Sequence, residues 1–393
     1  FNAIHYLVQK IKAGWQEGKV ASVLFLNVEG AFPNAVTDRL IHNLKKCKIP
    51  KIYVELIREL LTNRKTKLKF DDYMSLTFEI NNGIGQGNPL SMLLYIIYNA
   101  DILEIVDRYN GKDAIGYIDD VTIITIGEDL DETTNKLSLI MNGQGGGLEW
   151  SEDHNSRFEL SKLAVMHCLP TYKANRSDGN HPRLEINGTL VRKVESFKLL
   201  GVNVDSQLKW KYQLQKAVEK ATNWVLNFIR LTKPTTGIEA RLMRQLYIAT
   251  VIPKMTYGLD IWYTPPTKPL GHAHNTGSVS GLCQLAQIQR KAALAIAGGL
   301  RSTPNELIDT HAGILPMELT LLKICHRAIV RMATLSEQHL LHQMIRTTRR
   351  ATPNLRYKTP IDNLLHIFEI DPTRFEPIHP ARITPTYQPP FNI

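Results

Sequence analysis

Two adjacent carboxylates, Asp119 and Asp120, separate the apolar stretches of AIGYIDDVTIITI. Both stretches have the residue types of buried β-strands, so the acidic pair is predicted to lie at the turn of a hairpin. Neighbouring carboxylates repel each other, and a divalent cation that takes oxygen ligands, such as Mg²⁺, would neutralise that repulsion. The dipeptide alone is a weak signal, because Asp71 and Asp72 form the same pair where a solvated hairpin turn is predicted.

A glycine-rich loop, GIGQGNPLS at residues 83–91, precedes a predicted helix. Asn88 is placed to cap this helix and Pro89 to occupy its first turn. The free N–H groups of a helix start favour anions, and glycine lets a ligand approach the backbone closely. Gln86 adds a donor and an acceptor for a sugar or a base. Most such loops are simply turns, so this one indicates a binding site only together with other motifs.

The stretch LFLNVEGAFPN at residues 24–34 ends a third apolar strand. The N–H groups from Val28 to Phe32 could face a chain of phosphates, with Phe32 beside the sugar of the same ligand. Asn27 stands where the strand breaks. An amide therefore occupies a position at which a metal-binding turn would be expected to present a carboxylate.

These motifs need a scaffold of alternating helices and strands. Helical spacing of apolar residues predicts helices at 2–14, 37–46, 51–62, 89–107 and 131–141. Strands are predicted at 21–27 and 162–168, on both sides of Asp119, and as a hairpin over 65–80. Residues 142–156 are predicted to form a loop. The mixture indicates an α+β fold, an antiparallel sheet with helices on one face.

The second half of the chain reads as mostly helical. Residues 171–182 are a polar linker, and 183–205 are predicted to form short strands. Two amphipathic helices are predicted between 210 and 258, and helical patterns return after a Pro- and Gly-containing linker.

Composition points to polyanionic partners. With Lys+Arg 47 against Asp+Glu 37, the net charge of +10 favours nucleic acid first and acidic membrane surfaces second, although a merely basic protein fits the charge equally well. The four cysteines form no C-x-x-C pair, so neither a disulfide framework nor a zinc site is indicated. No apolar run approaches the roughly 18 residues of a membrane span. We expect an intracellular protein, in the cytoplasm or nucleus and not secreted, because the start of the chain has no signal-peptide layout.

Five stretches in order resemble the palm and primer-grip motifs of reverse transcriptases of non-LTR retrotransposons, particularly the kind common in fungal genomes. They are FLNVEGAFPNAV, NNGIGQGNPLSMLLYIIYNAD, GYIDDV, WSEDHNSRFELSK and SFKLLGVNVD. The resemblance runs from about residue 3 to 260, and residues 298–319 resemble the helical region that follows the thumb in the same elements. Each motif alone is unspecific, whereas the ordered set is specific.

The resemblance implies an RNA-directed DNA polymerase, a nucleotidyltransferase that uses two Mg²⁺ (or Mn²⁺) ions. Its expected partners are an RNA template, a DNA primer and a dNTP, with no small-molecule cofactor and no membrane. Asp119 and Asp120 match the paired metal ligands, and the backbone carbonyl of Val28 matches a further ligand. Phe32 matches the residue that blocks a ribose 2′-hydroxyl.

Other positions of the family map onto the nucleotide and the nucleic acid. Gln86 and Gly87 match the loop that touches the incoming nucleotide, although Gly85 replaces a proline that many relatives have. Lys162 matches a proton donor to pyrophosphate, and a surface lysine is an equal alternative. The nucleic-acid-binding lysines are expected on the primer-grip hairpin and the thumb helix, where a solvated helix face is the alternative; they are Lys198, Lys209, Lys211, Lys216 and Lys220.

The resemblance divides the chain into partial fingers and palm, a primer-grip-like hairpin, a helical thumb, a linker, a helical post-thumb region and a Pro-rich, poorly ordered tail. The corresponding ranges are 1–170, 183–208, 209–263, 264–281, 282–350 and 351–393. Only about 20 residues precede the first palm motif, and no nuclease or RNase H segment is recognised. We therefore expect the chain to be a fragment of an element.

Asn27 departs from the family pattern, which has an aspartate there as the ligand shared by both metals. Loss of one charge about 4 Å from a metal, at an effective dielectric of about 20, costs about 4 kcal/mol per unit of metal charge, or roughly three powers of ten in rate. Glu29 is not expected to compensate, because two residues further on it need not point at the metals. Catalysis is therefore expected to be impaired. The alternatives are an inactive RNA- or RNA/DNA-binding protein derived from a retroelement and, less favoured, a maturase or telomerase-like polymerase.

Overall fold

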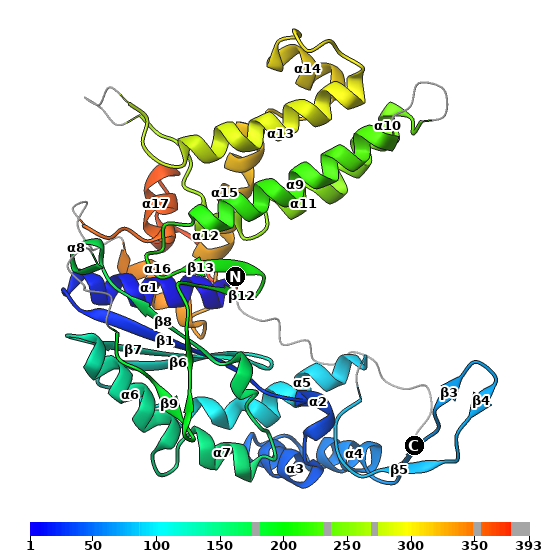
Figure 1. The fold of residues 1–393 in the computed structure, drawn as a ribbon, viewed down its shortest axis with the longest axis vertical. Helices are drawn as coiled ribbons and strands as arrows, with labels where there is room; N and C mark the ends of the chain where they lie inside the picture. The colour runs from blue at the N-terminus through cyan, green and yellow to red at the C-terminus, as the bar shows by residue number, and fades with distance from the viewer. Residues whose placement is uncertain (86, 175–180, 232–236, 269–273, 349–354, 379–393) are drawn as a thin grey trace. The chain divides into compact units, whose positions relative to one another are not determined.

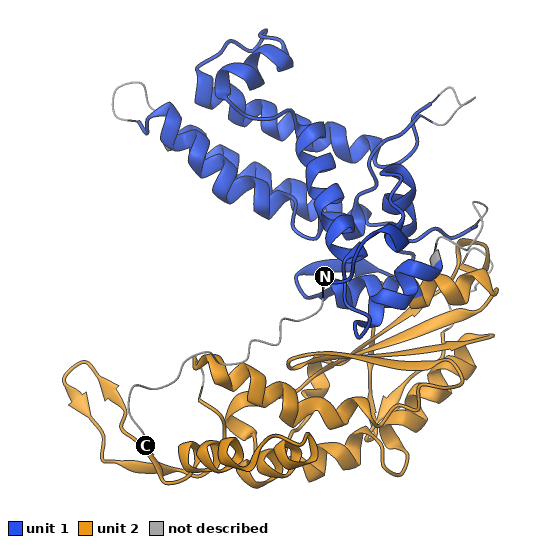
Figure 2. Cartoon of the chain, turned by 180° about the vertical axis from the view of Figure 1, so that it is seen from behind, with its two compact units in different colours: residues 1–9, 198–393 blue, residues 10–197 orange. Residues whose placement is uncertain are grey.

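The computed structural model describes residues 1–85, 87–174, 181–231, 237–268, 274–348 and 355–378. Two compact units divide the chain (Figure 2). The sheet unit is Lys10–Phe197, and the helical unit combines Phe1–Gln9 with Lys198–Ile393. Each unit is described by itself.

The sheet unit is built on a five-stranded sheet with the order β11-β8-β1-β7-β6 (Figure 1). Its strands are β1 (Val20–Asn27), β6 (Lys112–Tyr117), β7 (Asp120–Gly127), β8 (Ala164–Cys168) and β11 (Arg192–Lys193). β1 pairs antiparallel with both β7 and β8, whereas β11 runs parallel to β8. All residues of β1 before Asn27 are buried. Since apolar residues fill both faces of β1, it is the central strand.

Helices cover the face of the sheet that carries Leu24 and Leu26. They are α3 (Thr37–Lys46), α4 (Lys51–Leu61), α5 (Pro89–Asn99), α6 (Leu130–Asn142) and α7 (Gly147–Asp153). The end of α1 (Asn2–Gln16) packs near Ile126, and Trp15 Nε1 donates a hydrogen bond of 3.0 Å to the Cys168 carbonyl. The predicted α+β fold, with its antiparallel sheet and helical layer, is confirmed.

The predicted hairpin and the predicted helix cap at Asn88 both form. The predicted hairpin over 65–80 consists of β2 (Arg64–Thr66) paired with β5 (Phe78–Ile80) and β3 (Lys69–Phe70) paired with β4 (Tyr73–Met74). Asn88 caps α5, because its side chain accepts a hydrogen bond of 2.9 Å from Leu90 N. The predicted helix 89–107 is shorter, since α5 gives way to the 3-10 helix η1 (Ala100–Leu103).

Helix α7 forms inside the predicted loop 142–156. The prediction of a loop was wrong here. Glycines favour loops, yet Gly146 is the N-cap of α7 and Gly147 is its first residue. Trp150 is buried and stacks on His154 with a ring distance of 4.5 Å. Burial of this aromatic pair stabilises a short helix that local propensity does not favour.

The sheet unit also contains several short elements. They are α2 (Ala31–Asn34), the 3-10 helix η2 (Leu160–Lys162), α8 (Thr171–Ala174), β9 (Glu185–Ile186) and β10 (Thr189–Leu190).

The helical unit begins with the hairpin of β12 (Ser196–Leu199) and β13 (Val202–Asp205), whose first two residues lie in the sheet unit. Its helices are α9 (Lys211–Leu231), α10 (Ala240–Leu246), the π-helix η3 (Tyr247–Val251), α11 (Ile252–Met255), α12 (Leu259–Trp262), α13 (Val279–Ala297), α14 (Asn305–Ala312), α15 (Met317–Ala333) and α16 (Leu340–Thr348). His5 Nε2 lies 2.7 Å from the Asp260 carboxylate and thereby fastens the start of α1 to α12. No described helix combines the length and the apolar composition that a bilayer crossing requires.

The Pro-rich tail is more structured than predicted. Residues 360–367 form α17 (Pro360–Ile367), and the 3-10 helix η4 (Pro372–Arg374) follows. Thr359 and Asp362 form a capping box, and Pro360 occupies the first turn. Proline suits that position because the first helical N–H needs no partner within the helix. Ile361 and Leu364 are buried, so this part of the tail belongs to the core of the helical unit. Residues 379–393 lie outside the described residues.

Candidate active site

Asn27 and Asp120 are direct partners in the register of β1 and β7. Opposite residues of antiparallel strands point to the same face, with Cβ atoms about 4.5–5.5 Å apart. Asn27 is the last residue of β1 and Asp120 is the first of β7. The amide therefore stands beside one carboxylate of the acidic pair.

Asp119 lies in the turn between β6 and β7, next to Ile118, whose φ of 58° is left-handed. Burial, and secondarily the neighbouring charge of Asp119, raises the pKa of Asp120. The two carboxylates thus repel each other in a partly desolvated place. A divalent cation would relieve that repulsion, so the donor set fits one.

The segment that follows α7 pairs with the backbone of Asn27 and Val28. Val28 and Phe158 form an antiparallel bridge, and Glu159 N donates a hydrogen bond of 3.1 Å to the Asn27 carbonyl. The carbonyl expected to face the metals is that of Val28. The hydrogen bond from Glu159 N is accepted by the carbonyl of the preceding residue, Asn27. Glu159 is therefore opposite Asn27, a neighbour that sequence reasoning missed because the two residues are far apart in the chain.

Lys162 is held near this turn through Glu159. Its Nζ lies 2.5 Å from the Glu159 carboxylate, and its side chain is 61% exposed. The predicted proton donor is thus a solvent-exposed lysine that is paired with the residue opposite Asn27. Its exposure fits a surface lysine, and its pairing with Glu159 fits a role at the site.

Phe32 packs against Tyr95 of α5, with 5.0 Å between ring centroids. Burial, and secondarily the charge of Asp119, raises the pKa of Tyr95. Among the described residues the buried Tyr95 hydroxyl has no hydrogen-bond partner. Tyr95 therefore packs against the predicted sugar-contacting residue, and its hydroxyl is buried there.

The glycine-rich loop is tied to the same segment. Ile84 N donates a hydrogen bond of 2.8 Å to the Phe32 carbonyl, and Gly83 N donates one of 2.8 Å to the Ala35 carbonyl. Gly83 has a φ of 88°, and a Cβ there would lie 2.5 Å from the Pro33 carbonyl oxygen. Gly87 is exposed with a φ of 86°. Gln86 lies outside the described residues.

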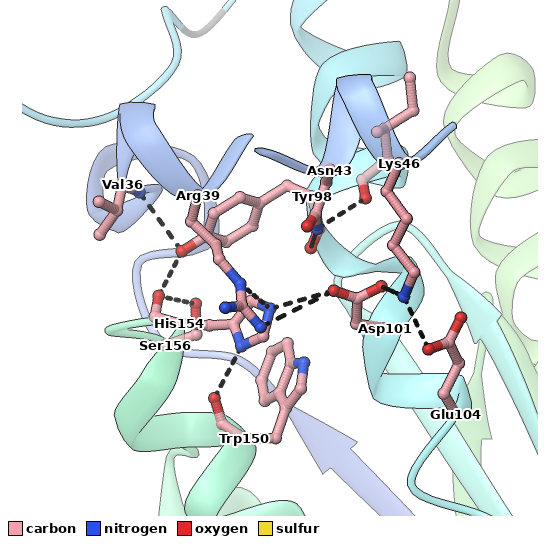
Figure 3. A network of polar contacts seen from close by, with 11 residues as sticks. Val36, Arg39, Asn43, Lys46, Tyr98, Asp101, Glu104, Trp150, His154 and Ser156 are labelled. Atoms are coloured by element: carbon pink, nitrogen blue, oxygen red, sulfur yellow. Dashed lines mark hydrogen bonds and ion pairs between the residues drawn. The ribbon is translucent and has the colours of Figure 1, made fainter. Parts of the chain in front are cut away.

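A polar network fixes α5 and the turn at His154 (Figure 3). The Tyr98 hydroxyl donates to the His154 carbonyl and accepts a hydrogen bond of 3.3 Å from Val36 N. Arg39 Nε donates to His154 Nε2 over 3.2 Å. The Asp101 carboxylate accepts a hydrogen bond of 3.1 Å from Lys46 Nζ. Since Tyr98 follows Tyr95 on the same helix, the network positions the wall beside Phe32.

The predicted nucleic-acid-binding lysines lie at the start of the helical unit. Lys198, Lys216 and Lys220 line one cavity. Lys209 precedes α9 and Lys211 is its first residue, and neither lines the cavity. Lys209 N donates a hydrogen bond of 2.9 Å to the Asp205 carboxylate.

The predicted metal ligands include two carboxylates, where the family pattern that the sequence resembles has three. Within the part of the chain that the structure describes, no group of three or more His, Cys, Asp or Glu side chains is arranged to hold a metal ion. Asn27, where the resemblance predicts a third carboxylate, lies directly opposite Asp120.

Comparison with known proteins gives the family. The model of the reverse transcriptase (RNA-dependent DNA polymerase) family matches residues 1–204. The chain is 23% identical over 263 residues to the RNA-directed DNA polymerase from mobile element jockey of Drosophila melanogaster. It is 22% identical over 271 residues to the probable RNA-directed DNA polymerase from transposon BS of the same organism. Each match covers 66% of this chain and 28% of the relative.

Solved structures of telomerase also align with the chain. Apo telomerase from Candida tropicalis aligns with a TM-score of 0.39 and 8% identity, covering 88% of this chain and 56% of that one. Telomerase from Candida albicans with a telomeric RNA fragment aligns with a TM-score of 0.37 and 10% identity, covering 87% and 52%. These scores are too low to bear on function. The family match, which spans more than half of the chain, shows that the chain belongs to the reverse transcriptase family.

Proposed function

We propose that the chain contributes the palm, thumb and following helical region of a non-LTR retrotransposon reverse transcriptase, and that its catalysis is impaired by Asn27. The observation that carries the proposal is the register of Asn27 and Asp120 beside the acidic turn. The match to 28% of the relatives' length supports a part of a larger protein. The motif GGLRSTPNELIDTHAGILPMEL supports the fungal kind of element.

In this proposal the acidic turn holds the catalytic cations, Mg²⁺ or Mn²⁺. Asp119, Asp120 and the Val28 carbonyl would hold them, and bound cations would activate the primer 3′-hydroxyl and stabilise the leaving pyrophosphate. The Asn27 side chain offers an amide oxygen that carries no charge. It therefore leaves part of the metal charge without compensation.

The other residues act on the nucleotide and the strands. Phe32, held by Tyr95, contacts the sugar of a dNTP, and Gln86 and Gly87 belong to the loop that faces it. Lys162 supplies a proton to the leaving group. The lysines of the primer-grip hairpin and α9 bind the phosphates of the RNA template and the DNA primer. We place this activity inside the cell, in the cytoplasm or nucleus.

Primer extension on an RNA template with Mg²⁺ or Mn²⁺ tests the proposed site. In the Asn27→Asp chain, Asp120→Asn is expected to abolish extension, because it removes a metal-binding charge. Asp72→Asn is the matched control, since it removes a carboxylate from the exposed β3–β4 turn. Equal losses from both substitutions, or none from Asp120→Asn, would refute the assignment of the acidic turn.

The second candidate is an RNA- or RNA/DNA-binding protein without catalytic activity. Asn27 itself favours it, because the substitution removes a charge from the metal-ligand set. Template binding by the unaltered chain without extension, in either metal, supports this candidate. A maturase or telomerase-like polymerase shares the palm motifs, but residues 298–319 resemble the retroelements instead.

A further inference from the structure

A cavity of about 680 Å³ opens within the helical unit. Small-molecule sites are commonly about 300–1,000 Å³, so this volume suits a ligand of nucleotide size. One face of α9 forms a wall, and the β12–β13 hairpin and the segment around α11 form the rest. The lining includes Lys198, Gln213, Lys216, Lys220, Trp224 and Lys254, with Gly201 and Tyr257 beside the hairpin.

Specific contacts hold the walls of the cavity together. The buried Gln213 Oε1 accepts hydrogen bonds of 2.9 Å from Asn203 N and 2.8 Å from Asn203 Nδ2, which fastens α9 to β13. The Tyr257 hydroxyl donates to the Leu200 carbonyl over 3.0 Å. Gly201 is required beside this ring, because its φ is 84° and a Cβ would lie 2.9 Å from Tyr257. The cavity is therefore a pre-formed feature of the unit.

The lining is strongly basic. It includes four lysines, Lys198, Lys216, Lys220 and Lys254, and no carboxylate. Lys216 pairs with Glu219 at 2.9 Å, whereas Lys198 and Lys220 form no ion pair within the described part of the chain. Several lysines around one hollow, with no carboxylate in the lining, favour a ligand that carries phosphate groups.

An aromatic face lies beside these charges. Lys254 Nζ sits 3.8 Å from the centre of the Trp224 ring. A nucleobase can take the place of the ammonium on the indole, because stacking on an aromatic side chain stabilises a bound base by about 1–3 kcal/mol. The displaced ammonium then reaches the phosphate of the same ligand. Bases inside a duplex are covered by their neighbours, so this exchange needs an unpaired base.

We propose that the cavity binds one unpaired nucleotide of a single nucleic-acid strand, with its base on Trp224 and its phosphates on Lys198, Lys216 and Lys220. This goes beyond binding along a duplex backbone, which uses phosphates alone. It also stands apart from the palm chemistry, since it requires neither a metal nor extension.

A binding measurement tests the proposal. A fluorescent oligothymidylate of five nucleotides is bound to the full chain at about 150 mM salt in the presence of EDTA. Trp224→Ala is expected to weaken binding about tenfold, and Trp224→Phe to restore part of it, because a phenyl ring still stacks. Lys220→Ala is expected to weaken binding and to lower the salt slope by about 0.7. Lys291→Ala, an exposed lysine on α13, is the charge-matched control and should leave binding unchanged.

Tryptophan fluorescence gives an independent readout. Trp15, Trp150, Trp210 and Trp262 are 5–8% exposed, which leaves Trp224 as the half-buried tryptophan of the five. The oligonucleotide should therefore quench the fluorescence saturably, while pyrophosphate alone should not. Thermal unfolding of each variant checks that it is folded, and Lys220→Ala replaces an exposed side chain in any case.

Several results would overturn the proposal. They are an absence of saturable quenching, an equal weakening of blunt duplex and single strand by Trp224→Ala, or competition by pyrophosphate as strong as by nucleotide. Tenfold tighter binding of free dTTP would overturn the assignment to a strand. Because no metal is present, failure here is distinguishable from failure of the proposed polymerase function.

Discussion

Asn27 is paired with Asp120 across the neighbouring strands β1 and β7, at the strand ends beside the turn of the β6–β7 hairpin. This register places an uncharged amide beside a carboxylate of the proposed metal-binding turn. Burial raises the pKa of Asp120, and the neighbouring charge of Asp119 raises it further. The proposed site therefore presents an uncharged amide beside two carboxylates.

Restoring that charge should make stability depend on a divalent cation. In Asn27→Asp, a third carboxylate beside Asp120 should destabilise the metal-free chain by about 1 kcal/mol, after allowance for screening by solvent. Mg²⁺ should then raise the melting temperature of the variant more than that of the unaltered chain. Thermal unfolding with and without Mg²⁺ measures this. Asn135→Asp on α6 is an exposed control, and an equal response from it would contradict the prediction.

Gly83 and Gly85 should differ sharply in their tolerance of alanine. Gly83→Ala combines a φ of 88° with a Cβ 2.5 Å from the Pro33 carbonyl oxygen, so it should cost about 1–3 kcal/mol. A Cβ on Gly85 meets no atom within 4 Å, and its φ is not left-handed. Gly85→Ala should therefore be neutral or slightly stabilising. Urea unfolding of both variants checks this, and similar losses would show that the described loop conformation is wrong.

Acid should destabilise the sheet unit through His167. Burial lowers the pKa of His167 from 6.5 to about 4, and its Nδ1 lies 2.8 Å from Ser22 Oγ. The folded chain holds the imidazole neutral, whereas the unfolded chain binds a proton below pH 6.5. Stability is therefore full above pH 6.5 and falls by about 3 kcal/mol as the pH drops towards 4.

Urea unfolding between pH 7.5 and pH 4.5 measures this loss. His167→Asn should reduce the slope of the free energy of unfolding against pH. Some slope should remain, because burial also lowers the pKa of His154. An unchanged slope in His167→Asn would rule His167 out as the main cause.

Removal of the Lys162 side chain should affect chemistry more than folding. Its ion pair with Glu159 is solvent-exposed, so Lys162→Ala should change the free energy of unfolding by less than about 1 kcal/mol. Lys136→Ala is a matched comparison that should cost more, since the half-buried Lys136 pairs with Glu132 at 2.7 Å and donates to the Ile126 carbonyl over 2.8 Å. In the Asn27→Asp chain, Lys162→Ala should slow single-turnover extension at unchanged stability. No effect on that rate would identify Lys162 as a surface lysine.

The sequence allowed the strands and the acidic turn to be predicted, because β1 and β7 are largely apolar, β6 contains the apolar stretch AIGY, and a turn between β6 and β7 has few alternatives. It also allowed the cap at Asn88 to be predicted. It could not reveal that Asn27 opposes both Asp120 and Glu159, because register between distant strands depends on the packing of the whole sheet. Glu159 was missed for that reason.

Two helices were missed because local signals opposed them. Three glycines precede α7 and a Pro-rich segment surrounds α17, yet buried side chains such as Trp150 and Leu364 stabilise both. The basic cavity was likewise beyond prediction, since Trp224 and Lys254 come from separate helices and meet only in the folded unit.

The most direct test of the account is single-turnover primer extension by the unaltered chain and by Asn27→Asp, with matched binding to an RNA template and DNA primer. The account predicts an increase of roughly three powers of ten in rate when the carboxylate is restored. Equal rates in the two chains, whether both extend the primer well or neither does, would contradict it.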